Sequence, residues 1–476
     1  MTPRFLASRT FDLSDQLRFA ALSGDANPMH VDPVAARRTQ FGEAVVHGVH
    51  GLLWALDQAA AAFELDACRG LVAQFPKPIL LGDAVAAYVI SESPDIRIEL
   101  RVQELVCTTI KLTRDAPRLP PAWPSVQTPA QRRSTPRDVA MDDMHNAQGA
   151  FDSSAPELSE AFPALAKALG PGVLEGLAAS TYIVGMEAPG LQSIFTKLTA
   201  AIVPHAAGGR VDFKVAMADS RFRLVEVHMQ SAAVRAKMNT FARVPPVLAP
   251  EMGDVNALVR AGEFAGHRAL IVGGSRGLGA ATAKLIAAGG GEVLITYARG
   301  AAEAEAVAAD IQAAGGHCEI LPYDATRAPV EQADLAALRP NAIYYFATGP
   351  IWKRKTQHFD AHVMREFMQV HVEGFAALAE AARAAMPGRL ALFYPSSVYA
   401  AEAPRDLGEY GAAKRAGEAI AENLAAVFSD TTIVVERLPA IATDQNASVT
   451  PVKTVSPVEA MLPIVRKMHA GLQDQA

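Results

Sequence analysis

Short apolar runs alternate with alanine-rich stretches along the C-terminal half of the chain. The apolar runs read RALIVGG, GEVLITYA, HCEILPYDA, AIYYFATG and RLALFYPSS, with stretches of helical composition between them. This alternation is typical of a doubly wound parallel sheet. We therefore predict an α/β domain with a doubly wound parallel sheet in this part of the chain.

The first 120 residues follow a different pattern, in which one helical segment stands among several strand-like runs. Residues 45–63 carry apolar side chains at helical spacing, which form one continuous stripe. The stripe consists of Val49, Leu52, Leu53, Leu56, Ala60 and Phe63. The strand-like runs include RGLVAQFPKPILL, DAVAAYVISES, IRIELRVQEL and TTIKLTR. We predict an α+β arrangement in which a sheet wraps around this helix.

Two proline-rich stretches, residues 118–136 and 243–254, interrupt these patterns. Proline-rich segments mark loops and linkers, so we predict three domains that cover residues 1–120, 138–245 and 255–476. The middle domain contains STYIVGMEAPGLQSIFTKL followed by RVDFKVAMADSRFRLVEVHMQ, a helix start with trailing strands that echo the first domain. In this interpretation Pro189-Gly190 precede an apolar helix and are the counterpart of His47-Gly48.

The bulk composition describes a globular protein with a small-molecule ligand. Half of the 476 residues are hydrophobic and 20% are charged, which favours large cores that form without metal or disulfides. The net charge is −6 and no run of five or six like charges occurs, so we expect no nucleic-acid partner and no membrane partner. The three cysteines, at 68, 107 and 318, fit a reducing cytosol and no zinc spacing. With no signal peptide and no membrane span in the sequence, we expect a cytoplasmic protein.

A glycine-rich turn stands at the start of the C-terminal domain. The segment RALIVGGSRGLGAATAKLIAAGG places Gly273, Gly277 and Gly279 between a predicted strand and a predicted helix. Glycines let the backbone approach a pyrophosphate, and a helix N-terminus offers free N–H groups and the positive end of its dipole. A purely structural turn uses the same residues, but the position inside a βαβ alternation favours a dinucleotide site.

A tyrosine and a lysine lie four residues apart further along the same domain. Tyr410 and Lys414 share one face of a predicted helix, where the ammonium group can lower the pKa of the phenol. Ser397 ends a predicted strand, where its hydroxyl can hydrogen-bond a substrate carbonyl. Taken alone, Tyr410 and Lys414 could simply be two solvated residues on one helix face. The glycine-rich turn earlier in the same domain favours the catalytic interpretation.

Residues 262–476 as a whole resemble the short-chain dehydrogenase/reductase family. The resemblance implies hydride delivery from a nicotinamide, with Ser397 as hydrogen-bond donor to the carbonyl, Tyr410 as acid/base and Lys414 as ribose anchor and pKa-lowering cation. Ser396 is the alternative for the serine role. The cofactor-binding residues that the resemblance implies are Gly273, Ser275, Arg276, Gly277, Leu278, Gly279, Arg299, Asp324, Tyr410 and Lys414.

Three positions depart from the family pattern. The usual Thr at the head of the glycine motif is Val272, the usual Asn-Asn-Ala-Gly reads FATG in residues 346–349, and the position of a proton-relay Asn holds His371. These departures concern the proton relay rather than the fold. His371 either takes over the water-holding role or packs within an apolar helix.

The end of the second strand of this domain indicates which nicotinamide cofactor it takes. An acidic residue there would hold the ribose 2′-hydroxyl of NAD, whereas this sequence has Tyr297, Ala298 and Arg299. An Arg suits the 2′-phosphate of NADP. We therefore predict NADP(H), with Arg276 assisting; a solvated Arg299 is the alternative. By resemblance, Asp324 borders the adenine.

A carboxylate and an imidazole bracket a turn in the first domain. Asp25 and His30 flank Asn27-Pro28, a pair that favours a turn and lets both side chains converge on one small volume. Such a pair can share one water and add it across a conjugated double bond, or remove it again. The first N–H groups of the following helix, near Gly48, point toward the thioester oxygen that becomes enolate-like. The alternative is that Asp25 caps a turn and His30 is a satisfied loop side chain.

Residues 10–115 resemble the MaoC-like (R)-specific enoyl-CoA hydratases of the hot-dog fold. The matching features are the D-x-N-P-x-H run from Asp25 to His30, the following HVDP and FG, the V-x-H-G helix start, and FPKPILLGD with Phe75, Pro78, Gly82 and Asp83. The resemblance implies Asp25 and His30 as catalytic residues, and Asn27 and Gly48 as substrate-binding residues. The middle domain is then a second hot-dog half that lacks the motif.

The two resemblances make chemical sense together, because (R)-3-hydroxyacyl thioesters are the product of one activity and the substrate of the other. We expect a double hot-dog followed by a Rossmann-like sheet, in a bifunctional hydratase and 3-oxoacyl reductase of fatty acid metabolism. Its substrates would be thioesters of CoA or acyl carrier protein, and we expect a homo-oligomer. One alternative is a reductase of a sugar nucleotide or other carbonyl with an acyl-transferring hot-dog part; another is a hot-dog part that only binds acyl groups or dimerises.

Overall fold

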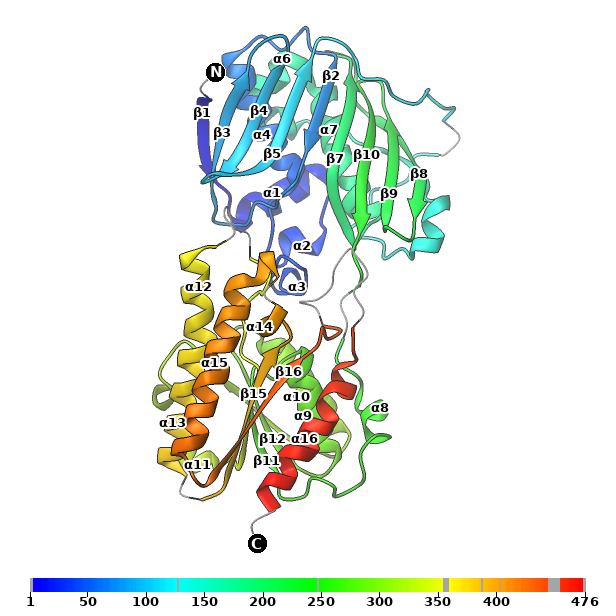
Figure 1. The fold of residues 1–476 in the computed structure, drawn as a ribbon. Coiled ribbons are helices and arrows are strands. Elements are labelled where there is room, and N and C mark those ends of the chain that lie inside the picture. The colour runs from blue at the N-terminus through cyan, green and yellow to red at the C-terminus, as the bar shows by residue number, and fades with distance from the viewer. Residues whose placement is uncertain are drawn as a thin grey trace. The chain divides into compact units, whose positions relative to one another are not determined.

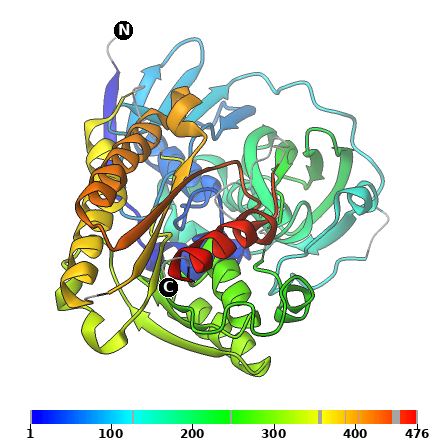
Figure 2. The same cartoon turned by 60° about the horizontal axis from the view of Figure 1, so that its bottom comes forward.

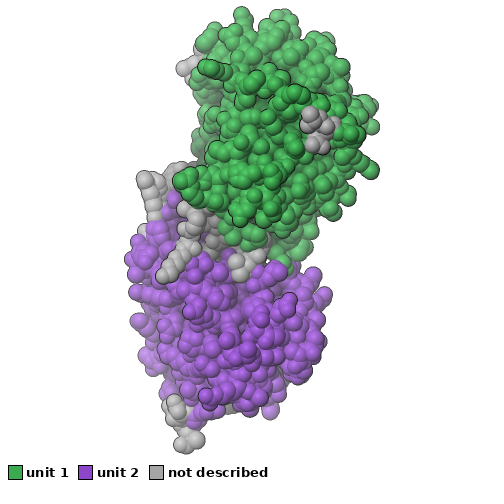
Figure 3. Space-filling model, turned by 90° about the vertical axis from the view of Figure 1, so that its right-hand side faces the viewer, with its two compact units in different colours: residues 1–245, 448–451 green, residues 246–447, 452–476 purple. Residues whose placement is uncertain are grey.

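A computed structural model describes residues 3–125, 128–245, 248–353, 359–386, 388–402, 404–443 and 454–473. The chain forms two compact units, which meet in the sequence between residues 245 and 246 (Figure 3). This division falls within the proline-rich stretch at residues 243–254. In the part of the chain that the structure describes, no helix has the length and apolar character needed to cross a membrane.

The first unit is built on a ten-stranded sheet in which all described neighbours pair antiparallel (Figure 1). The strand order is β1-β3-β4-β5-β2-β7-β10-β9-β8-β6. The strands are β1 (Arg4–Thr10), β2 (Gly70–Gln74), β3 (Ala84–Ser91), β4 (Ile96–Val102), β5 (Leu105–Thr113), β6 (Gln148–Asp152), β7 (Ser193–Ile202), β8 (Arg210–Asp219), β9 (Leu224–Gln230) and β10 (Val234–Ala242).

Two halves of this sheet share one topology. In each half the first strand lies at the outer edge, the second lies at the centre, and the third, fourth and fifth fill the space between them. The halves join where β2 pairs with β7, with Gly70 opposite Ala201 and Gln74 opposite Lys197. The second half therefore repeats the architecture of the first, although it carries no D-x-N-P-x-H run. The exact domain limits remain predictions.

A long buried helix lies against each half of the sheet. In the first half it is α4 (Gly48–Ala62), where Val49, Leu52 and Leu56 are at most 1% exposed, as the predicted apolar stripe requires. In the second half it is α7 (Pro171–Tyr182), whose residues from 172 to 182 are all buried. The two helices also contact each other. Removing a leucine side chain from such a core costs about 2–5 kcal/mol.

The remaining helical segments of the first unit are short. They are α1 (Leu13–Ser23), α2 (Pro28–Val31), α3 (Pro33–Ala36), α5 (Glu157–Ala161), α6 (Pro163–Leu169), the 3-10 turn η1 (Met141–Asn146) and the π-helical turn η2 (Ile183–Glu187).

One sequence expectation for the second half is wrong. Pro189-Gly190 do not precede a helix; they follow α7 and η2, and the apolar run after them is strand β7. The β-branched residues Ile194, Thr196 and Thr199 in this run favour a pleated strand over a helix. The helix that corresponds to α4 begins at Pro171, where proline at the first position suits a helix start.

The second unit is a six-stranded parallel sheet in the order β13-β12-β11-β14-β15-β16. Its strands are β11 (Arg268–Val272), β12 (Glu292–Tyr297), β13 (His317–Pro322), β14 (Ala342–Tyr345), β15 (Leu390–Ser397) and β16 (Thr431–Leu438). The order reverses between β11 and β14, the point at which doubly wound sheets bind ligands. The predicted fold class, antiparallel hot-dog sheet followed by Rossmann-like sheet, is confirmed.

Helices cover both faces of the parallel sheet and bury two separate apolar cores. On one face, α9 and α16 lie side by side (Figure 2). On the other, α13 and α15 pack against β15. The helical segments are α8 (Met252–Asn256), α9 (Gly277–Ala288), α10 (Ala301–Ala313), η3 (Pro329–Glu331), α11 (Leu335–Leu338), α12 (Ala361–Met368), η4 (Gln369–Glu373), α13 (Gly374–Ala385), α14 (Tyr399–Glu402), η5 (Arg405–Leu407), α15 (Gly408–Val427) and α16 (Pro457–Gln473).

Candidate functional site

A cavity of about 510 Å³ lies in the first unit and takes its walls from both halves of the sheet. The first half contributes Asp25, His30 and Gly48, and the second contributes Thr181 and Gly185. Much of the remaining lining is apolar: Met29, Phe41, Val45, Val46, Phe75, Pro76, Pro78, Ile79, Val184, Ile194, Phe195 and Phe241. A largely apolar cavity with a few convergent polar groups is the usual form of a small-molecule site.

Asp25 is a buried residue of the cavity wall and comes just after α1. Gly24 ends α1 in the left-handed region, with φ of 82°, and turns the chain inward. The carboxylate accepts hydrogen bonds on both oxygens, from the Asn27 N–H to Oδ1 at 3.2 Å and from the Thr181 hydroxyl to Oδ2 at 2.6 Å. Burial raises the pKa of Asp25, and His30 together with these two hydrogen bonds opposes the rise.

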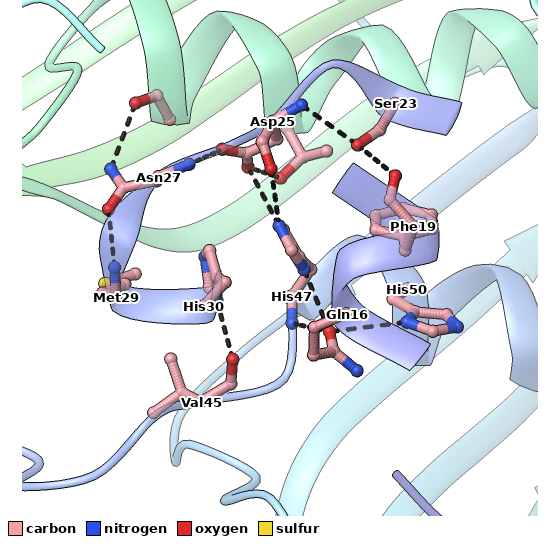
Figure 4. Close-up of polar contacts among 12 residues, drawn as sticks. Gln16, Phe19, Ser23, Asp25, Asn27, Met29, His30, Val45, His47 and His50 are labelled. Atoms are coloured by element: carbon pink, nitrogen blue, oxygen red, sulfur yellow. Dashed lines mark hydrogen bonds and ion pairs between the residues drawn. The ribbon is translucent and has the colours of Figure 1, made fainter. Parts of the chain in front are cut away.

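His30 faces the same space from α2 (Figure 4). Its Nδ1 lies 2.8 Å from the carbonyl oxygen of Val45. Because a carbonyl can only accept, Nδ1 carries the proton and Nε2 keeps a lone pair. Burial, reinforced by the neighbouring His47, lowers the pKa of His30 to about 3. His30 is therefore a neutral base at pH 7, with a ring nitrogen within 4.8 Å of an Asp25 carboxylate oxygen.

His47 supports both groups from the residue before α4. Its ring stacks on His30 with centroids 3.8 Å apart. Its Nδ1 lies 2.9 Å from Gln16 Oε1, and its Nε2 lies 3.0 Å from the backbone oxygen of Asp25. Burial lowers the pKa of His47 to about 4. A neutral imidazole donates from one nitrogen only, so one of these two oxygen contacts is the hydrogen bond that holds the His47 ring against His30.

Gly48 begins α4 at the cavity wall, as the sequence predicts. The N-cap residue makes no side-chain hydrogen bond to the helix start, so the first N–H groups are not capped by it. A Cβ at Gly48 would lie 3.0 Å from the Phe75 ring, which shows how closely the backbone approaches that wall. The positive end of the helix thus faces the space where Asp25 and His30 converge.

Asn27, which the sequence analysis predicts to bind substrate, hydrogen-bonds to the backbone of the second half of the sheet. Its Nδ2 donates to the carbonyl oxygens of Gly185 and Gly190, both at 3.1 Å, and its Oδ1 accepts from the Met29 N–H. Asn27 is fully buried and does not line the cavity. The amide is therefore saturated by backbone partners, and it joins the motif of the first half to the chain of the second.

In the second unit, the glycine turn connects β11 to α9. Gly273 has φ of 82°, and a Cβ there would lie 3.0 Å from the carbonyl group of Phe346. A Cβ on Gly279 would lie 2.2 Å from the backbone oxygen of Gly273, so only glycine lets α9 pack this close to the turn. Arg276, the N-cap of α9, makes no side-chain hydrogen bond to the helix start. Ser275, Gly277 and Leu278 complete the turn that leads into α9, and a helix N-terminus offers free N–H groups to an anion.

The residues expected around the nucleotide lie where the two neighbouring strands end. Arg299 is exposed and follows β12 by two residues. Asp324 follows β13, where its Oδ1 accepts hydrogen bonds from the Thr326 N–H and hydroxyl at 2.9 and 2.7 Å. These bonds, with a smaller contribution from Arg299, hold the pKa of Asp324 below its ordinary value.

Ser397 and Tyr410 meet at the carboxyl end of β15. A hydrogen bond with Ser397 lowers the pKa of the Tyr410 phenol, but burial outweighs it and raises the pKa. Lys414 donates to the backbone oxygen of Pro395 at 2.7 Å, and its Nζ lies 5.6 Å from the centre of the Tyr410 ring. Burial lowers the pKa of Lys414 to about 7. The sequence expectation that the lysine lowers the pKa of Tyr410 is therefore not met in this arrangement.

The structure also places Ser396 and His371, which the sequence analysis gave as alternatives for the serine role and for the proton relay. The Ser396 hydroxyl donates to the Glu418 carboxylate, which Arg437 also holds, so this serine is engaged away from Tyr410. His371 is fully buried on the π-helical turn η4, where its ring contacts the rings of Phe367 and Tyr410, which also contact each other. Among the residues that the structure describes, neither ring nitrogen of His371 has a hydrogen-bond partner.

Sequence comparison finds the same two parts in known families. Residues 1–111 match the family described as MaoC like domain, and residues 267–452 match the short chain dehydrogenase family. The chain thus carries a MaoC-like domain in its N-terminal part and a short-chain dehydrogenase domain in its C-terminal part, which confirms both resemblances inferred from the sequence.

Individual relatives cover only parts of the chain. It is 36% identical over 86 residues to the (R)-specific enoyl-CoA hydratase of Aeromonas caviae, which is 17% of this chain and 63% of that protein. It is 35% identical over 126 residues to Protein MaoC of Klebsiella aerogenes, which is 26% of this chain and 32% of that protein. The chain therefore spans less than two thirds of either relative. A solved short chain dehydrogenase from Burkholderia cenocepacia in complex with NADP is 22% identical, with a TM-score of 0.39 over 42% of this chain and 90% of that chain.

Proposed function

We propose that this protein is a bifunctional enzyme that interconverts 3-oxoacyl, (R)-3-hydroxyacyl and 2-enoyl thioesters. The observation that carries the proposal is the convergence of the buried residues Asp25 and His30 on a largely apolar cavity beside the start of α4. The matching relatives support it, since one is an (R)-specific enoyl-CoA hydratase. The C-terminal domain supplies the second activity.

In the hydratase half, Asp25 and His30 hold one water against the double bond of a 2-enoyl thioester. One of them accepts a proton as the water oxygen bonds to C3, and that proton is then returned to C2, so that the elements of one water are added. Negative charge that builds up on the thioester oxygen is stabilised by the N–H of Gly48 at the positive end of α4. The reverse sequence dehydrates the 3-hydroxyacyl thioester.

The cavity lining supports a thioester with an anionic carrier. Lys77 and Lys197 are the lysines that line it, one from the turn after β2 and one from β7. Their charges suit the phosphates of CoA or of the phosphopantetheine on an acyl carrier protein. The aromatic walls, with Phe75, Phe195 and Phe241, suit the acyl chain.

In the reductase half, NADP(H) supplies the hydride when bound. Gly273 and Gly279 leave the backbone room that a pyrophosphate needs, and the start of α9 offers its N–H groups. Arg299 lies where it can hold the 2′-phosphate. Ser397 orients the substrate carbonyl, Tyr410 donates the proton to its oxygen, and Lys414 holds the ribose.

Crotonyl-CoA hydration tests the hydratase half. The wild type should form (R)-3-hydroxybutyryl-CoA, and Asp25→Asn, which keeps the shape of the side chain, should reduce kcat/KM by about 10²-fold or more. Ketone reduction by Asp25→Asn should stay unchanged. In turn, Tyr410→Phe should abolish NADPH-dependent reduction of acetoacetyl-CoA and leave hydration unchanged. Equal hydration by Asp25→Asn and wild type would contradict the proposal.

A further inference from the structure

The Asp25 carboxylate receives one of its two hydrogen bonds from the half of the sheet that has no catalytic motif. The donor is Thr181, whose hydroxyl lies 2.6 Å from Asp25 Oδ2 although 156 residues separate the two in the sequence. Thr181 is 4% exposed and also lines the cavity. The bond therefore joins a buried hydroxyl to a buried carboxylate in the wall of the cavity.

This hydrogen bond is not the usual choice for a hydroxyl inside a buried helix. Serine and threonine in helices commonly donate to a carbonyl of their own helix. Ser180, the preceding residue of α7, does so: its hydroxyl donates to the Leu177 carbonyl at 2.6 Å. The hydroxyl of Thr181 instead reaches out of α7 to the first half. Its direction is thus fixed by Asp25 rather than by helix geometry.

We propose that Thr181 is a positioning residue of the hydratase site, which holds the Asp25 carboxylate in the orientation and charge state that the reaction needs. The inference rests on the proposed hydratase function. It gives the second half a part in catalysis: that half does more than complete the sheet, because it supplies one of the two donors that fix the catalytic carboxylate.

The two carboxylate oxygens are held by different parts of the fold. The Asn27 N–H holds Oδ1 from within the motif, and Thr181 holds Oδ2 from across the cavity. With both oxygens fixed, the carboxylate cannot rotate about its Cβ–Cγ bond, and its remaining lone pairs keep one direction. A water shared with His30 then meets the same lone pair in every turnover.

The hydroxyl also affects the charge of Asp25. Burial raises the pKa of this carboxyl group, and the Thr181 hydrogen bond is one of the few interactions that lower it. The other titratable groups that face Asp25 are His30 from α2 and His47 from the start of α4, whose Nε2 lies 3.9 Å from Oδ2. Both histidines are kept neutral by burial. Loss of the Thr181 hydroxyl would therefore raise the pKa of Asp25 further.

Four variants separate this role from simple packing. Thr181→Val keeps the shape and removes the donor; Thr181→Ala removes it with a smaller side chain in case valine is poorly accommodated. Thr181→Ser restores the donor. Ser180→Ala is the matched control, since it deletes a buried hydroxyl on the same helix that does not touch Asp25. Circular dichroism and thermal melting establish that each variant is folded.

The first readout is the pH profile of kcat/KM for crotonyl-CoA hydration. Thr181→Val and Thr181→Ala should lose about 10- to 100-fold at pH 7, as expected for a hydrogen bond to a charged group. The acid limb of their pH profiles should move to higher pH, because a carboxylate that has lost a hydrogen-bond donor takes up a proton more readily. Thr181→Ser and Ser180→Ala should follow the wild type within a few fold. An unshifted acid limb in Thr181→Val would overturn the proposal.

The second readout does not depend on activity. In protein labelled with ¹³C at the aspartate carboxyl carbons, the Asp25 signal is identified by its loss in Asp25→Asn and titrated by NMR. Its midpoint should be higher in Thr181→Val than in the wild type, and restored in Thr181→Ser. Equal midpoints would overturn the role of Thr181, whereas a shifted midpoint in a protein that hydrates no enoyl thioester would overturn the proposed function instead.

Discussion

The backbone of Gly185 packs directly against the carboxylate of Asp25. A Cβ on Gly185 would lie 2.1 Å from Asp25 Oδ1 and 2.6 Å from its Cγ, so no side chain fits there. Gly185 belongs to the π-helical turn η2 in the second half of the sheet, and its carbonyl also accepts a hydrogen bond from Asn27. The backbone of Gly185 in the second half therefore limits where the Asp25 carboxylate of the first half can lie.

Gly185→Ala should impair hydration without unfolding the unit. The new methyl group forces the carboxylate to move, and a displacement of about 1 Å in a catalytic group can cost about 10²-fold in rate. We expect a loss of that size in kcat for crotonyl-CoA and no change in ketone reduction. Gly51→Ala in α4 is the control, because its Cβ would meet methyl groups of Leu100 and Ile79 at 3.3 and 3.9 Å and no atom of Asp25 within 4 Å. Similar hydration by the two variants would contradict this reading of the contact.

The N-terminal unit should lose stability as the pH falls, in part through His30. Its pKa is about 3 in the folded protein against 6.5 for an ordinary histidine. Between these values the unfolded chain binds a proton that the folded chain does not, so acidification favours unfolding. Between pH 7 and pH 5 this difference amounts to about 2 kcal/mol. Urea unfolding should show that the wild type loses about that much more stability than His30→Gln; equal losses would show that His30 is not kept neutral.

Patterns formed by residues close together in the sequence were enough to predict the fold class of both units. The 3.6-residue spacing of Val49, Leu52 and Leu56 placed a buried helix, and the alternation of apolar runs placed the parallel sheet. Such patterns succeed because burial on one face acts on residues that are close in the sequence. The D-x-N-P-x-H run is local for the same reason: Asp25 and His30 reach one cavity through a single turn.

The contacts between the two halves of the ten-stranded sheet could not be predicted from such local patterns. Thr181 and Gly185 lie in a segment with no motif, and only the folded sheet brings them to Asp25. The one signal in the sequence is a threonine amid the apolar run of α7, which buried helices rarely tolerate without a partner. The hydrogen bonds of Asn27 could not be predicted either, because its partners Gly185 and Gly190 are more than 150 residues away in the sequence.

The two cavity lysines should matter for the carrier rather than for the acyl group. Replacing Lys77 and Lys197 together by glutamine should raise the KM for crotonyl-CoA by about tenfold, the equivalent of about 1.4 kcal/mol. The KM for crotonyl-pantetheine, which lacks the phosphates, should stay unchanged. Lys111→Gln serves as the control, since this lysine pairs with Asp95 at 2.8 Å on the sheet. An equal rise in KM for both thioesters would show that the lysines do not recognise phosphate.

Arg299 should decide between the two nicotinamide cofactors. It is exposed at the end of β12, where a 2′-phosphate would lie in a doubly wound fold. Arg299→Gln should raise the KM for NADPH by about tenfold or more and leave the KM for NADH unchanged. Arg268→Gln, which alters an exposed arginine paired with Glu292 at the start of β11, provides the control. A wild type that uses NADH as well as NADPH would contradict the assignment.

The most direct test of the account follows both reactions in one mixture. Wild-type protein with acetoacetyl-CoA and NADPH should consume NADPH and release crotonyl-CoA, measured by absorbance and mass spectrometry. Asp25→Asn should consume NADPH and accumulate (R)-3-hydroxybutyryl-CoA, and Tyr410→Phe should consume none. Consumption of NADPH by the wild type without crotonyl-CoA, even on prolonged incubation, would contradict the claim that one chain carries both activities.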